Sequence, residues 1–97
     1  QKDQRSIIEL SDIPNIDLYM DQVTTFMETK LSGYKRNEKD KILTKTMINN
    51  YVKSRLLPSP EKKKYTKDHM MVLIMIYFFK NIIYTMIYKL QHIHNMT

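Results

Sequence analysis

Apolar residues recur at spacings of three and four along the first third of the chain, which is the period of an amphipathic α-helix. The stripe comprises Ile16, Tyr19, Met20, Val23, Phe26, Met27 and Leu31. Pro14 precedes it, and Asn15 or Asp17 is placed to cap the first turn. The pattern predicts a first helix over residues 16–31, ended by Gly33 and preceded by a flexible arm at residues 1–12.

A second, shorter helical pattern occupies residues 44–55, with Thr44 as the predicted N-cap. Its predicted buried face comprises Leu43, Met47, Ile48, Tyr51 and Val52. The helix is expected to end before Pro58, because a residue that precedes proline is disfavoured in the helical region. Residues 33–41 lack an apolar period and predict an exposed, charged loop. Residues 58–65 predict a proline-stiffened bend and a short basic turn, which we interpret as a minimal wing.

The third helical pattern is the longest, because nothing between Thr66, its predicted N-cap, and Leu90 disfavours a helix. Residues 70–79 are apolar on every side and are therefore expected to be buried on every side. After Lys80 the pattern becomes amphipathic, and the chain offers its apolar stripe no obvious internal partner. We therefore expect a homodimer whose interface includes Ile83, Ile87 and Leu90.

These patterns predict a mainly α-helical fold: a helix-turn-helix with a minimal wing and a long C-terminal helix at residues 66–90. A single domain is expected over residues 13–90, followed by a tail at residues 91–97. One glycine and three prolines in 97 residues favour a few long helices over many short strands with tight turns. Cysteine is absent, which excludes disulfides and thiolate metal sites and fits a cytoplasmic protein.

Positive charge is concentrated in the middle of the chain. Residues 33–67 contain eleven basic and three acidic residues, a net charge of +8, whereas the rest has five basic and seven acidic residues, a net charge of −2. The usual partners of such a face are phosphate backbones or anionic lipid. The alternative interpretation is a surface that only keeps the protein soluble.

The second predicted helix carries polar side chains that suit duplex DNA. Asparagine matches the adenine edge in the major groove, while threonine and lysine suit phosphates or guanine. Such side chains share one face of the helix: Lys45, Thr46, Asn49, Asn50 and Lys53. We interpret this face as a recognition surface for double-stranded DNA.

Three short segments follow one another here: Thr-Met-Ile-Asn-Asn-Tyr at residues 46–51, Arg-Leu-Leu-Pro at 55–58 and Lys-Tyr-Thr at 64–66. Together they resemble the DNA-binding domain of MerR-type regulators, in which a Gly-Leu-Leu-Pro-like exit and a basic wing follow the recognition helix. Arg55 takes the place of that glycine. The resemblance implies that Lys62, Lys63 and Lys64 form the wing, and that Tyr51 and Tyr65 pack or contact phosphates.

A more extensive resemblance covers residues 13–83. It rests on Asp-Ile-Pro at residues 12–14, Leu-Tyr-Met-Asp-Gln-Val at 18–23, Leu-Thr-Lys-Thr-Met-Ile-Asn-Asn-Tyr at 43–51 and Lys-Lys-Lys-Tyr at 62–65. These motifs are similar to an uncharacterised bacterial family, the domain of unknown function DUF1836. The resemblance implies a bacterial regulator without an established activity, and the segment from Thr85 onward lies outside it.

Other classes of protein fit the sequence less well. No nucleophilic triad, glycine-rich phosphate loop or paired carboxylate appears, so we expect no enzyme and no cofactor. His69, His92 and His94 lack the spacing and companion ligands of a metal site. Lys80 and Asn81 interrupt the apolar segment in a way that disfavours a membrane span. The alternatives that remain are a protein-interaction module that uses the basic face and a membrane-associated helical protein.

Overall fold

The protein is described here by a computed structural model that covers residues 8–96. The elements in chain order are a 3-10 turn η1 (Leu10–Asp12), helix α1 (Met20–Leu31), a second 3-10 turn η2 (Ser32–Tyr34), helix α2 (Lys45–Lys53) and helix α3 (Lys67–Met96). The described residues form no strand. The predicted mainly α-helical fold with a long C-terminal helix is thus confirmed, while residues 1–7 of the predicted arm lie outside the described part.

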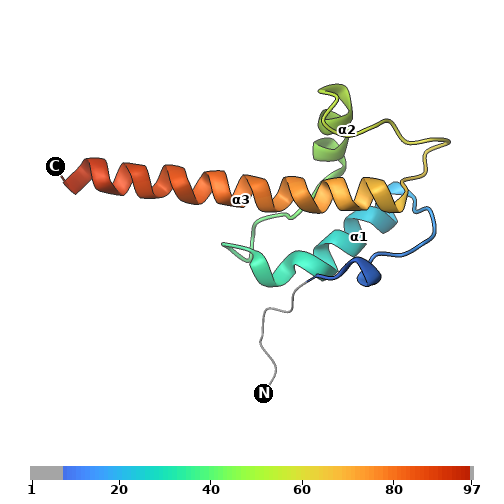
Figure 1. Ribbon diagram of the computed structural model, residues 1–97, viewed down its shortest axis with the longest axis horizontal. Helices are drawn as coiled ribbons and strands as arrows, with labels where there is room; N and C mark the ends of the chain where they lie inside the picture. Colours follow the sequence, from blue (N-terminus) through green and yellow to red (C-terminus); the bar gives the residue numbers. More distant parts are fainter. Residues whose placement is uncertain (1–7, 97) are drawn as a thin grey trace, which may run out of the picture.

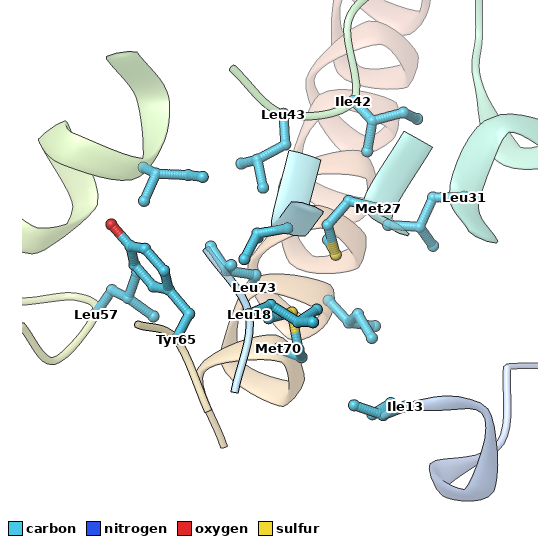
Figure 2. Packing of buried hydrophobic residues seen from close by; sticks show 13 residues of the cluster. Ile13, Leu18, Met27, Leu31, Ile42, Leu43, Leu57, Tyr65, Met70 and Leu73 are labelled. Carbon is cyan, nitrogen blue, oxygen red and sulfur yellow. The ribbon is translucent and has the colours of Figure 1, made fainter. Parts of the chain in front are cut away.

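Helix α3 forms the long axis of the molecule, and α1 and α2 accompany only its N-terminal half (Figure 1). The side chains that fill the interior point toward one another from all three helices and from the segments between them (Figure 2). The buried apolar cluster consists of Ile13, Leu18, Val23, Met27, Leu31, Ile42, Leu43, Ile48, Leu57, Tyr65, Met70, Leu73 and Ile74. The C-terminal half of α3 contributes nothing to this core and projects away from it.

Helix α1 begins at Met20, four residues later than the apolar spacing predicts. The reason is an antiparallel bridge in which Leu18 N donates to Tyr65 O at 2.9 Å and Tyr65 N donates to Leu18 O at 2.7 Å. This pairing holds Leu18 extended and buried, so Ile16 and Tyr19 leave the predicted stripe and are 67% and 50% exposed. Neither predicted cap is used.

The start of α2 follows the prediction. The Thr44 hydroxyl accepts a hydrogen bond from Met47 N at 3.1 Å, which makes Thr44 the N-cap. Ile48 is fully buried, and Met47, Tyr51 and Val52 are partly buried against the core. The predicted inner face of this helix is therefore confirmed, and the helix ends at Lys53, two residues before the predicted end.

Helix α3 differs from the prediction in both length and burial. It continues to Met96, so residues 91–96 of the predicted tail are helical. Met70, Leu73 and Ile74 are buried, whereas Met75 is 66% exposed. The expectation of burial on every side is wrong, because the rest of this small domain covers only one side of the helix. By length and composition, α3 is also the one described helix that could cross a membrane.

His69 is the one buried polar residue among those described, and its ring fastens the start of α3. Thr66 N donates to Nδ1 at 2.9 Å, and Nε2 lies 3.0 Å from Pro58 O. A neutral ring protonated at Nε2 satisfies both partners, because Nδ1 then accepts and Nε2 donates. The Tyr65 ring packs edge-on against this imidazole, with the ring centroids 5.4 Å apart.

Burial raises the pKa of the Tyr65 hydroxyl above its ordinary value of 10.0. The unfolded chain therefore ionises at this tyrosine before the folded protein does, and stability is lost as the pH rises above about 10. We expect Tyr65→Phe to reduce the alkaline loss of stability, measured by urea denaturation at neutral and alkaline pH. Tyr88→Phe, at an exposed position, is the matched control for loss of a tyrosine hydroxyl. Identical pH profiles for both variants would contradict this assignment.

Candidate nucleic-acid interface

The outward face of α2 consists of the five residues that the sequence singles out. Each of their side chains is exposed: Lys45, Thr46, Asn49, Asn50 and Lys53. Within residues 8–96, none of these side chains makes a hydrogen bond or an ion pair. The helix therefore presents amide, hydroxyl and ammonium groups that are unengaged on one face, while Ile48 anchors the opposite face in the core.

The end of α2 is shaped by Arg55, whose φ of 66° lies in the left-handed region. Leu56 N donates to Tyr51 O at 2.9 Å and Arg55 N donates to Val52 O at 3.0 Å. These two hydrogen bonds define a Schellman motif, in which the left-handed position is usually glycine. The turn thus provides hydrogen bonds to the last carbonyls of the helix, although the left-handed conformation is unfavourable for arginine. The Arg55 side chain is left exposed.

The segment predicted as a minimal wing contains one tight turn. Lys64 N donates to Glu61 O at 2.9 Å, and the two central residues, Lys62 and Lys63, have φ values of 52° and 66°. Positive φ at both central positions is the pattern of a type I′ turn, which favours asparagine and glycine. Both lysine side chains are exposed. Among the described residues other than glycine, positive φ occurs at Arg55, Lys62 and Lys63 only, and all three are basic.

Three of the sequence-predicted contacts are already engaged within the domain. Tyr65 is 3% exposed, so its side chain belongs to the core and not to the exposed basic surface. Lys64 is exposed, and its Nζ lies 5.6 Å from the centroid of the Tyr19 ring. Tyr51 is partly buried, and its hydroxyl accepts a hydrogen bond from Lys80 Nζ at 3.2 Å. Tyr51 therefore links α2 to the middle of α3.

Part of the central basic segment is directed inward, which the sequence does not reveal. Lys35 pairs with Glu28 on α1. The Arg36 guanidinium donates to Thr85 Oγ1 at 2.6 Å and to Asn81 O at 3.3 Å, and it lies 4.4 Å from the Tyr84 ring centroid. Asn81 and Thr85 are 45 and 49 residues from Arg36 in sequence, so no local pattern can predict these contacts. The predicted exposed loop at residues 33–41 is thus anchored to two helices.

The amino-acid sequence matches the family model described as Domain of unknown function (DUF1836) over residues 8–96. The chain therefore belongs to this family. The match extends through the C-terminal half of α3, so the expectation that the family resemblance stops before Thr85 is wrong. Neither a curated protein nor a solved structure matches the chain.

The left-handed conformation of Arg55 yields a prediction about stability. Arg55→Gly removes a steric penalty of about 1–2 kcal/mol, partly offset by the greater freedom of glycine in the unfolded chain. We expect a net gain of about 0.5–1 kcal/mol in the free energy of unfolding, measured by urea denaturation. Arg55→Ala is the matched control, because alanine loses the charge but retains the penalty. Equal stability of the glycine and alanine variants would disprove the explanation.

Proposed function

We propose that this domain binds duplex DNA as a cytoplasmic regulator, as a helix-turn-helix with a minimal wing of the MerR type. In this arrangement the outward face of α2 enters the major groove, and the turn at residues 61–64 contacts phosphates. The observation that carries the proposal is the set of basic residues in left-handed conformations between α2 and α3, next to a helix face of unengaged polar side chains.

The conformations of Arg55, Lys62 and Lys63 support a role for their charges. Glycine adopts positive φ without steric penalty, whereas each side chain with a Cβ costs about 1–2 kcal/mol there. Strained conformations of this kind cluster at functional sites. Glycine at these three exposed positions would make the fold more stable. A cation there lowers stability but adds charge that can bind anions. Glycine at the position of Arg55 in the MerR-type pattern agrees with the observed φ.

The placement of charge supports the same surface. Both α2 and the following loop lie toward the N-terminal end of α3, away from its projecting C-terminal half (Figure 1). Lys45 is in the first turn of α2 and Lys53 is in its last turn, so cations flank the two asparagines. Helix α1 carries Asp21 and Glu28 on its surface and is expected to stay away from phosphates. A basic surface beside an acidic helix orients the domain on DNA.

The contribution of the turn is tested by the salt dependence of binding to random-sequence duplex DNA. Lys62→Ala combined with Lys63→Ala should weaken binding to all sequences and reduce the slope of log K against log salt by about 0.9 per lost phosphate contact. Lys30→Ala combined with Lys89→Ala removes the same charge from α1 and α3 and should leave the slope unchanged. Equal slopes for the two double variants would reject the turn as a phosphate contact.

The contribution of α2 is tested by selection from a randomised duplex library. Asn49→Ala and Asn50→Ala should each relax the preference at one or two base pairs by about 1–3 kcal/mol, while binding to non-specific DNA stays intact. Asn95→Ala, at the exposed end of α3, is the control and should select the wild-type sequence. An unchanged consensus in both α2 variants places base recognition elsewhere.

A further inference from the structure

One face of α3 carries an uninterrupted heptad pattern that crosses the boundary between its packed and its projecting halves. Apolar residues follow one another at alternating spacings of four and three: Val72, Ile76, Phe79, Ile83, Met86, Leu90 and Ile93. This is the a/d spacing of a left-handed coiled coil, sustained over three heptads. We call this set the heptad face.

The heptad face points away from the domain from Ile76 onward, whereas Val72 at its start is partly buried against the core. At 100° per residue, its centre lies on the opposite side of the helix from Met70, Leu73 and Tyr77, which face the core. Arg36 contacts Asn81 and Thr85 on that same core side, so the domain extends along the helix without turning onto the heptad face. Phe79, Met86 and Leu90 are 64%, 58% and 63% exposed as a result.

The projecting half of α3 leaves a contiguous set of large apolar side chains in water, which usually marks an interface. The heptad face and the residues beside it account for most of the large exposed apolar side chains of α3.

We propose that a second copy of this chain covers the heptad face, and that the two α3 helices form a coiled coil. The a positions are Ile76, Ile83 and Leu90, and the d positions are Val72, Phe79, Met86 and Ile93. Lys80 and Lys89 then lie at the edges of the seam, where their stems cover apolar surface, and Lys80 keeps its hydrogen bond to the Tyr51 hydroxyl. This pairing does not depend on DNA binding.

A lipid bilayer fits α3 less well than a second copy does. A membrane span must be apolar around its whole circumference over roughly twenty residues. The projecting half of α3 contains Lys80 and Lys89, and the Arg36 guanidinium is bound to Thr85 on its other side. The aliphatic side chains there gather on the heptad face and on its two flanks at Ile82 and Ile87, whereas the opposite side carries Asn81, Thr85, Tyr88 and Gln91. This asymmetry suits one partner helix better than an apolar solvent on all sides.

Sedimentation equilibrium of the purified chain at tens of micromolar, without DNA, tests the proposal. The expected mass is twice the 11.8 kDa of one chain. Ile83→Lys combined with Leu90→Lys should give a monomer, because two charges enter the seam. Tyr88→Lys combined with Gln91→Lys adds the same charge to the opposite side of the same turns and should stay dimeric. Circular dichroism shows whether each variant keeps its helices.

A milder pair of variants guards against misfolding. Ile83→Ala combined with Leu90→Ala preserves helix propensity and should raise the dissociation constant of the dimer by more than about tenfold. Tyr88→Ala combined with Gln91→Ala should leave it unchanged. A monomeric wild type, or equal constants for the two alanine pairs, would overturn the proposal. A wild type that is monomeric in solution and binds phosphatidylcholine vesicles would show that lipid covers the heptad face instead.

Discussion

Two backbone hydrogen bonds between Leu18 and Tyr65 determine much of the remaining structure. They join the segment before α1 to the segment before α3. Each of these helices begins two residues after its paired residue, at Met20 and at Lys67. The two hydrogen bonds also bury Tyr65 against His69, whose ring nitrogens secure Thr66 and Pro58. The loop between α2 and α3 is thereby fixed at its C-terminal end, and Lys62, Lys63 and Lys64 are presented on a turn whose end cannot move independently of the core.

Features that depend on neighbouring residues are predicted well from the sequence. The errors arise where contacts between residues far apart in the sequence determine the structure. The Thr44 cap and the inner face of α2 depend on neighbours within a few residues, and both are confirmed. The start of α1 depends on Tyr65, 47 positions after Leu18, and the spacing of apolar residues contains no trace of it. The apolar run at residues 70–79 shows that this helix has apolar side chains on every side. It does not show how much of that surface the rest of the small domain can cover, and Met75 is left exposed for this reason.

The candidate interface shows the same division. The outward direction of Asn49 and Asn50 follows from helical periodicity alone. The left-handed conformations of Lys62 and Lys63 do not, because a lysine run gives no indication of positive φ and lacks the asparagine or glycine that marks such turns. The charge excess of residues 33–67 overstates the free charge of this segment, since Lys35 and Arg36 are engaged within the domain. Composition locates a basic surface, whereas only tertiary contacts show which cations remain available.

The anchoring of α2 by a single fully buried side chain has a consequence for local stability. Helix α1 buries Val23, Met27 and Leu31, whereas α2 buries Ile48 alone and is tied to α3 at its surface by Lys80 and Tyr51. Because the free energy of local opening follows the apolar surface buried, α2 detaches at a smaller free-energy cost than the rest of the core. Its amide protons therefore exchange with solvent before those of α1. A ligand held by the face of α2 slows that exchange and stabilises the least stable helix of the core.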